Sequence, residues 1–196
     1  MSKGEETRQV ILGSGLDLVS EVGLEGLTIG SLASRVGMSK SGLFAHFGSK
    51  EELQCAVLDA AAESFVEVVL RPAFRAPRGV PRIEALFERW LRWPEQAFSG
   101  GCPIIAAATE LDDRPGPVRD RLLVHLGDLY GSLARAARLA VEQGDFRADL
   151  EPKQFAYELW ANMVAYHHHH RLFDPAEARQ RARRMFEEQL GRARPA

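Results

Sequence analysis

The stretch that decides the fold runs from residue 28 to residue 50 and reads TIGSLASRVGMSKSGLFAHFGSK. Thr28 is a favourable N-cap, and the apolar residues after it recur every three or four positions, as they do along one face of a helix. Gly37 ends this short helix, and Ser39 caps a second one over about residues 40–47. Two short helices joined by a tight turn that contains glycine have the dimensions of a helix-turn-helix.

The second of these helices is suited to the major groove of DNA, which is about 12 Å wide and admits one α-helix. Its first turn, residues 39–42, offers two hydroxyls, one ammonium and free backbone N–H groups. These donors suit phosphates and base edges, and they stand at the positive end of the helix dipole. Lys50 opens the next helix, where a cation opposes the dipole, so an external phosphate explains it better than a structural role. An ordinary solvated lysine is the alternative.

Helical signals extend along the rest of the chain, whereas no sustained strand pattern occurs. Apolar residues at helical spacing predict a helix over Glu5–Val22, and a capping box at Ser49-x-x-Glu52 opens another that runs to about Leu70. Glycine and proline breaks then separate five further helices, at about 81–98, 104–112, 117–143, 152–171 and 175–191. We therefore predict an all-α protein with an N-terminal three-helix domain that carries the helix-turn-helix, residues 1–52, and a larger C-terminal helical bundle, residues 53–196.

Composition and charge exclude several classes of protein. The 196 residues are 45% apolar, enough for a core, and 25 Lys and Arg stand against 27 Asp and Glu, a formal net charge of −2. A polybasic coat is therefore excluded, although a local basic patch is not. The two cysteines, Cys55 and Cys102, are too few for a disulfide framework or a Cys-rich zinc site. No apolar run is long enough for a membrane span, and we expect a cytoplasmic protein with no membrane partner.

Residues 24–53, LEGLTIGSLASRVGMSKSGLFAHFGSKEEL, resemble the DNA-binding segment of TetR-family transcriptional regulators. The match includes the Ile-x-x-Leu-Ala packing face, the Val-Gly-Met-Ser turn, the Gly-Leu-Phe-x-His-Phe run and the Ser-Lys-Glu-Glu-Leu opening of the next helix. The resemblance implies a homodimer that binds a roughly palindromic operator in double-stranded DNA and is released by a small apolar or aromatic effector. It implies a regulator without catalytic activity or cofactor, in this family usually a repressor and less often an activator, whose C-terminal bundle binds the effector and forms the dimer.

The same resemblance places the DNA contacts on the two short helices and the turn after them. They are Thr28, Ser39, Lys40, Ser41, Gly42, Leu43, His46 and Lys50. Over residues 1–50 five basic side chains balance five acidic ones. Affinity must therefore come from the placement of a few cations, and we expect a salt dependence equivalent to about three to six phosphates per dimer.

The C-terminal bundle is expected to hold the dimer and effector surfaces, with intramolecular core as the alternative for every residue chosen. In this family the last two long helices usually pair across the dimer. Their apolar faces supply the dimer candidates Phe155, Leu159, Met163, Ala182, Met185, Phe186 and Leu190. Aromatic walls with few polar groups are typical of small-molecule sites. The effector candidates are Trp90, Trp93, Phe98, Leu126, Tyr130, Trp160 and Tyr166.

A run of four histidines, residues 167–170, supports an alternative function, a helical metalloprotein or enzyme. Consecutive side chains on a helix point about 100° apart, so four in a row cannot bind one metal ion. His167 and His170 share a face, and a third ligand would have to come from elsewhere, such as His125. No nucleophile–base motif, phosphate loop or His-Glu-x-x-His accompanies the run, so we predict no metal site and no catalytic residue. Cys102 lies near a predicted helix start, where the dipole could favour the thiolate, although a core thiol is commoner.

Overall fold

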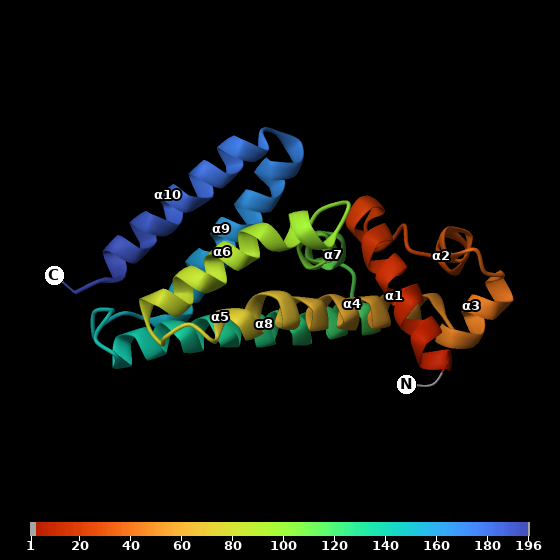
Figure 1. Ribbon diagram of the computed structural model, residues 1–196, viewed down its shortest axis with the longest axis horizontal. Helices are drawn as coiled ribbons and strands as arrows, with labels where there is room; N and C mark the ends of the chain where they lie inside the picture. The colour runs from red at the N-terminus through yellow and green to blue at the C-terminus, as the bar shows by residue number, and fades with distance from the viewer. Residues whose placement is uncertain (1–2, 196) are drawn as a thin grey trace. The chain divides into compact units, whose positions relative to one another are not determined.

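The computed structural model describes residues 3–195, with the side chains of all of these except Lys3 and Gln96 (Figure 1). These residues form helices and no strands, which confirms the all-α fold. The elements are α1 (Lys3–Val22), α2 (Ile29–Val36), α3 (Lys40–Phe47), α4 (Lys50–Phe65), the π-helix η1 (Val66–Leu70), α5 (Arg71–Ala73), α6 (Val80–Ala97), α7 (Pro103–Leu111), α8 (Pro117–Glu142), α9 (Pro152–Leu172) and α10 (Pro175–Ala193).

The predicted helix from residue 49 to Leu70 is interrupted. The α-helical pattern ends at Phe65, a π-helix covers Val66–Leu70, and Pro72 stands in the first turn of α5. A proline has no N–H to donate to the carbonyl four residues earlier, and a π-turn is one way in which a helix accommodates such a break. The other predicted helices begin and end within about two residues of the observed ones.

The chain forms two compact units, and α4, α6 and α8 lie at the points where it passes from one to the other. The first unit is Met1–Phe65 with Pro94–His125, and the second is Val66–Trp93 with Leu126–Ala196. The functional boundary predicted between residues 52 and 53 falls within α4. The division into two compact units does not test where the DNA-binding domain ends, so that boundary stays a prediction.

The core of the first unit is formed where α1 packs against α2, α4 and α7. Leucines from each helix of the helix-turn-helix contribute to it, and a Cβ added at Gly15 of α1 would lie 2.9 Å from Val57 of α4. Its fully buried side chains include Ile11, Val19, Leu27, Leu32, Leu43, Leu53 and Val57. The short helices α2 and α3 are therefore held by the longer α1 and α4.

In the second unit α9 and α10 pack closely against each other. Two buried amides tie them together, because Asn162 Nδ2 donates to Ala182 O (2.9 Å) and Gln189 Nε2 donates to Phe155 O (2.8 Å). The ring of Phe186 stacks on Phe87 of α6, with centroids 4.0 Å apart. The apolar faces of α9 and α10 are thus used inside the chain.

This packing corrects most of the predicted dimer surface. The prediction is wrong for Phe155, Leu159, Met163, Ala182, Phe186 and Leu190, which are buried within the chain and leave almost no surface for a partner. Met185 alone of the seven candidates is exposed, at 44%. The apolar face of an amphipathic helix can be buried by a helix of the same chain or by a helix of a second copy, and the sequence pattern does not distinguish the two.

Among the described residues, no helix is both long and apolar enough to cross a membrane.

Candidate nucleic-acid interface

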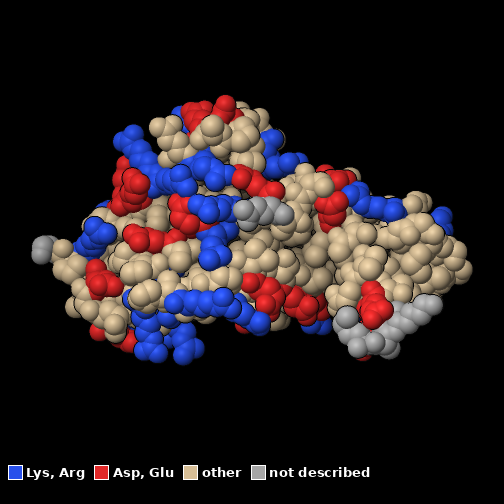
Figure 2. Space-filling model, viewed as in Figure 1, with Lys and Arg blue, Asp and Glu red and all other residues tan. Residues whose placement is uncertain are grey.

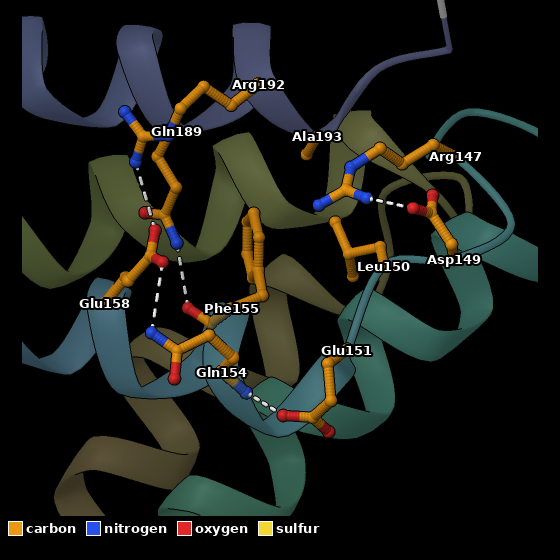
Figure 3. A pocket seen from close by; sticks show the side chains of 10 residues that line it. All are labelled: Arg147, Asp149, Leu150, Glu151, Gln154, Phe155, Glu158, Gln189, Arg192 and Ala193. Atoms are coloured by element: carbon orange, nitrogen blue, oxygen red, sulfur yellow. Dashed lines mark hydrogen bonds and ion pairs between the residues drawn. The ribbon is translucent and has the colours of Figure 1, made fainter.

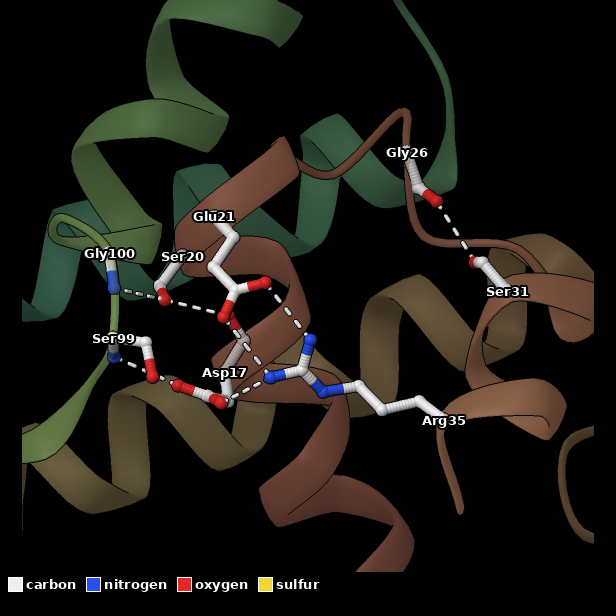
Figure 4. Close-up of polar contacts among 8 residues, drawn as sticks. All are labelled: Asp17, Ser20, Glu21, Gly26, Ser31, Arg35, Ser99 and Gly100. Carbon is white, nitrogen blue, oxygen red and sulfur yellow. Dashed lines mark hydrogen bonds and ion pairs between the residues drawn. The ribbon is translucent and has the colours of Figure 1, made fainter. Parts of the chain in front are cut away.

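The start of α2 is built by a reciprocal cap between Thr28 and Ser31. Thr28 Oγ1 accepts the N–H of Ser31 (3.0 Å), and Ser31 Oγ accepts the N–H of Thr28 (2.9 Å). Ser31 Oγ also reaches Gly26 O at 3.0 Å (Figure 4). These bonds fix the entry into α2 and leave Thr28 exposed at its first turn.

The turn between α2 and α3 needs a glycine and a serine. Gly37 closes α2 with φ of 68°, a left-handed conformation that glycine adopts without steric cost. Ser39 then caps α3, its Oγ accepting the N–H of Gly42 at 3.1 Å. The second helix therefore begins at the residue that the sequence predicts.

The predicted contact residues lie on the outside of this motif with one exception. Thr28, Ser39, Lys40 and Ser41 are exposed, and Gly42, His46 and Lys50 are half-buried. Leu43 is fully buried, so the prediction is wrong for its side chain. Because Leu43 and Phe47 occupy the inner face of α3, they anchor the helix while its first turn faces outward.

Lys40 lies beside the start of α2. A Cβ added at Gly30 would come within 3.3 Å of Lys40 Cε and 3.6 Å of its Nζ, and within 3.8 Å of Thr28 Oγ1. An ammonium, a hydroxyl and the first N–H groups of a helix thus gather in one place, a combination that favours a phosphate oxygen. The missing side chain of Gly30 leaves the room for Lys40.

Charge around the motif is sparse and uneven. Residues 26–50 contain Arg35, Lys40 and Lys50 and no acidic residue. In the view of Figure 2 the surface over α2 and α3, at the right, is mostly uncharged and carries only a few Lys and Arg side chains. Few cations are available to meet DNA, as the charge balance of residues 1–50 predicts.

Two of these three cations already have carboxylate partners. Arg35 Nη1 lies 2.9 Å from Glu21 Oε2, and the same guanidinium pairs with Asp17 (Figure 4). Lys50 Nζ lies 3.1 Å from Glu25 Oε2, so Lys50 has an ion-pair partner within the chain, and its predicted contact with phosphate stays a prediction. Among the described residues of 26–50, Lys40 is the cation without an ion pair.

The segment after α6 is bonded to the second half of α1. Ser99 N–H donates to Asp17 Oδ1 (2.8 Å), and Gly100 N–H donates to Ser20 Oγ (2.9 Å; Figure 4). The hydrogen bond from the Ser99 N–H lowers the pKa of Asp17, and the Arg35 guanidinium adds a smaller effect in the same direction. A Cβ at residue 100 would lie 1.9 Å from Ser20 O, so only glycine permits this approach. Asp17 therefore joins α2 to the segment 99–101.

Sequence reasoning missed these carboxylates and their partners. Arg35 and Asp17 are 18 residues apart, and Ser99 and Asp17 are 82 apart. No local pattern marks such pairs. The spacing of Asp17 and Glu21 on one face of α1 is the only sequence signal, and it predicts a basic partner without naming it.

Three of the seven predicted effector residues form an aromatic cluster in the second unit. The Trp160 ring lies 5.7 Å from Trp90 and 5.6 Å from Tyr130, centroid to centroid. Tyr166 OH donates to Leu91 O at 3.1 Å, and Trp93 is buried. Leu126 belongs to the same unit and is half-buried, whereas Phe98 belongs to the first unit. Their role in ligand binding stays a prediction.

A separate hollow of about 170 Å³ opens at the start of α9 and the end of α10 (Figure 3). Its charged groups pair with one another: Arg147 with Asp149 (2.6 Å) and Arg192 with Glu158 (3.1 Å). Glu151 is occupied in capping α9. Since these charges are neutralised within the chain, the hollow offers a ligand no free ionic partner among them.

The histidine run, His125 and Cys102 are the residues that the sequence offers for metal binding or a thiolate. No group of three potential ligands among the described His, Cys, Asp and Glu could hold a metal ion. His125 Nε2 is bonded to Asp59 Oδ1 at 2.7 Å, and burial lowers the pKa of His167 to about 4. Burial raises the pKa of Cys102 to about 12, so the suggestion of a thiolate there is wrong.

A helix-turn-helix whose second helix presents its first turn to solvent is the architecture of a DNA-binding protein. Two family descriptions match the chain: "Bacterial regulatory proteins, tetR family" over residues 11–57, and "Tetracyclin repressor-like, C-terminal domain" over residues 79–186. The chain belongs to the TetR family of transcriptional regulators. Membership of this family supports a regulator rather than an enzyme and gives the metalloprotein alternative no support.

Individual relatives agree with this assignment. The tetracycline repressor protein class C of Escherichia coli is 38% identical over 61 residues, which are 31% of this chain and 26% of that protein. The matched segment thus spans about a quarter of that relative. A TetR-family regulator from Agrobacterium tumefaciens has the same fold, with TM-score 0.85 and 18% identity, over 98% of this chain and 100% of that one. AibR, solved with isovaleryl coenzyme A and operator DNA, aligns with TM-score 0.70 and 22% identity over 89% and 95%.

Proposed function

We propose that this chain is a ligand-responsive repressor that binds a roughly palindromic operator as a homodimer. The observation that carries the proposal is the exposed first turn of α3, where Lys40 stands beside Thr28 and the start of α2. Ser39 and Ser41 are exposed, His46 is half-buried, and all three carry groups that can donate hydrogen bonds to DNA. In a dimer two such helices would enter major grooves about one helical turn apart.

Lys40 supplies the direct test of DNA binding. We expect Lys40→Ala to weaken operator binding about tenfold or more, since both halves of a dimer lose a charged hydrogen bond. It should also reduce the slope of log affinity against log salt by about two, one per subunit. The measurement is fluorescence anisotropy, at several salt concentrations, with a duplex selected from random DNA.

Lys153→Ala is the matched control, because Lys153 is an exposed lysine of α9 in the second unit. It should leave affinity and slope unchanged. Operator binding by Lys40→Ala that equals the wild type at every salt concentration would remove Lys40 from the interface.

The effector is proposed to bind beside the aromatic cluster of Trp90, Tyr130 and Trp160. Three neighbouring rings provide a wall that suits an apolar or aromatic molecule. AibR, a structural neighbour, is recorded with isovaleryl coenzyme A and operator DNA, and acyl-coenzyme A compounds are therefore sensible first probes. A ligand can release DNA only through different affinities for the bound and free states. Titration of the protein–operator complex with such compounds should raise the fraction of free duplex.

A further inference from the structure

The ammonium of Lys50 is held by a carboxylate that a second cation shares. Lys50 Nζ lies 3.1 Å from Glu25 Oε2, and Arg114 Nη1 lies 3.3 Å from Glu25 Oε1. The three side chains are 40%, 54% and 60% exposed, in the order Lys50, Glu25, Arg114. One carboxylate therefore joins the start of α4 to the segment between α7 and α8.

The position of Glu25 is fixed by the end of α7. The Glu110 carboxylate accepts the N–H of Leu24 (3.0 Å) and the N–H of Glu25 (2.8 Å). The Lys50 ammonium, followed by the Arg114 guanidinium, lowers the pKa of Glu25. Glu25 is therefore a fixed negative charge at neutral pH, beside a lysine that could otherwise meet a phosphate.

We propose that Glu25 is a positioning residue that restrains operator binding by competing with DNA phosphate for Lys50, and that Arg114 weakens this competition. The inference rests on the proposed function, because it takes Lys50 as a phosphate contact. When a phosphate draws Lys50 away, Arg114 remains to neutralise Glu25, so the carboxylate is not left without a counterion. Exposed ion pairs are weak, which keeps the restraint small and reversible.

The restraint is tied to a part of the chain outside the helix-turn-helix. Both Glu110 and Arg114 lie at the end of α7 or just after it. A shift of that segment would move Glu25 toward or away from Lys50. The charge available for DNA would then change without any movement inside α2 or α3.

A purely structural role for the ion pair predicts the opposite sign. If Glu25 served only to hold α4 in place, its removal would weaken operator binding. If it competes with phosphate, Glu25→Gln should tighten binding about two- to fivefold at 0.1 M salt, the range expected of an exposed pair. Arg114→Gln should weaken binding by a similar factor, because Lys50 then faces the undivided charge of Glu25.

The experiment compares Glu25→Gln, Arg114→Gln, Lys50→Gln and their double variants by fluorescence anisotropy on the selected operator duplex. The gain from Glu25→Gln should vanish in the Lys50→Gln background, and the loss from Arg114→Gln should vanish in the Glu25→Gln background. Glu51→Gln is the matched control, since Glu51 is an exposed acid next to Lys50 in α4. It measures the general effect of removing one negative charge and should change affinity less than Glu25→Gln.

The outcomes separate this inference from the proposed function. Wild-type protein that binds no selected duplex would overturn both. If Lys40→Ala and Lys50→Gln weaken operator binding, the proposed function stands. The competition alone would then be overturned if Glu25→Gln left affinity unchanged or lowered it, or if its gain in affinity persisted in the Lys50→Gln background. A gain in Glu51→Gln equal to that in Glu25→Gln would overturn it as well.

Discussion

Gly100 shows how one missing side chain brings two segments of the first unit together. A Cβ at this residue would lie 1.9 Å from Ser20 O, so Gly100→Ala must displace the segment 99–101 from α1. The displacement breaks the bonds that Gly100 and Gly101 donate to Ser20. We expect the free energy of unfolding to fall by about 1–3 kcal/mol, the range of overpacking substitutions, as measured by urea denaturation.

Gly127 provides the control at the same scale. It lies inside α8, is exposed, and a Cβ there would meet nothing within 4 Å. Gly127→Ala should raise stability by about 0.5–1 kcal/mol, because alanine is the better helix former. Equal changes in the two variants would show that contact with Ser20 is not what requires Gly100.

Single residues were predictable where their role is local. Thr28, Ser39 and Gly37 act on backbone groups a few positions away, and the structure confirms each of these caps. Glu25 and Lys50 are 25 residues apart, and their pairing depends on where two separate turns meet. Local chemistry therefore predicted the helix caps of the site. The carboxylates that pair with its cations could be identified only from the tertiary structure.

At the scale of elements, α3 separates helix capping from DNA binding. Asp is as good an N-cap as Ser, so Ser39→Asp should keep α3 intact and leave Tm nearly unchanged. The added carboxylate would face the phosphates at the first turn of the helix, and operator affinity should fall about tenfold or more.

Ser39→Ala reverses the comparison. It loses the bond from Gly42 N–H and should cost about 1 kcal/mol of stability without adding charge. Thermal denaturation followed by circular dichroism, together with anisotropy on the same samples, distinguishes the two variants. Unchanged affinity in Ser39→Asp would mean that the first turn of α3 does not approach DNA.

The helices themselves followed from periodicity and caps, but the faces they bury did not. Leu159 and Met163 on α9 and Phe186 on α10 have the apolar spacing of an interface, and all three are buried within one chain. Apolar periodicity predicts that one face of a helix is buried, but it does not identify the segment that buries it. The π-helix Val66–Leu70 was missed for a related reason, since its residues VEVVL fit an ordinary helix and only Pro72 beyond it signals a break.

For the whole molecule, His167 predicts how stability depends on pH. Burial lowers its pKa from 6.5 to about 4, and the positive charges of His168, Arg171 and His170 act in the same direction. In the unfolded chain the His167 imidazole therefore binds a proton near pH 6.5, whereas in the folded chain it does so only near pH 4. Stability from this group is complete above pH 6.5 and is lost as the pH falls toward 4.

We expect the wild-type Tm to fall between pH 7 and pH 5 by roughly 2–4 °C more than that of His167→Gln, after allowance for the solvent that still reaches the ring. Scanning calorimetry across this range gives the measurement. His168→Gln is the comparison variant: His168 is exposed in the same run, and because burial is the largest cause of the low His167 pKa, this variant should keep most of the wild-type pH dependence. The same slope in wild type and His167→Gln would assign the pH dependence to other groups.

Assembly of two copies can be tested at Met185, the dimer candidate that remains exposed on α10. Arg181 and Arg184 already flank it on the surface, so Met185→Arg would bring further positive charge against a second copy across a twofold axis. We expect light scattering after size exclusion to show a monomer in place of a dimer, and affinity for a full palindrome to fall toward that for a half-site. Val10→Arg, a change at an exposed apolar residue of α1, should leave the mass unchanged. A Met185→Arg dimer of normal affinity would place the pairing surface elsewhere on the chain.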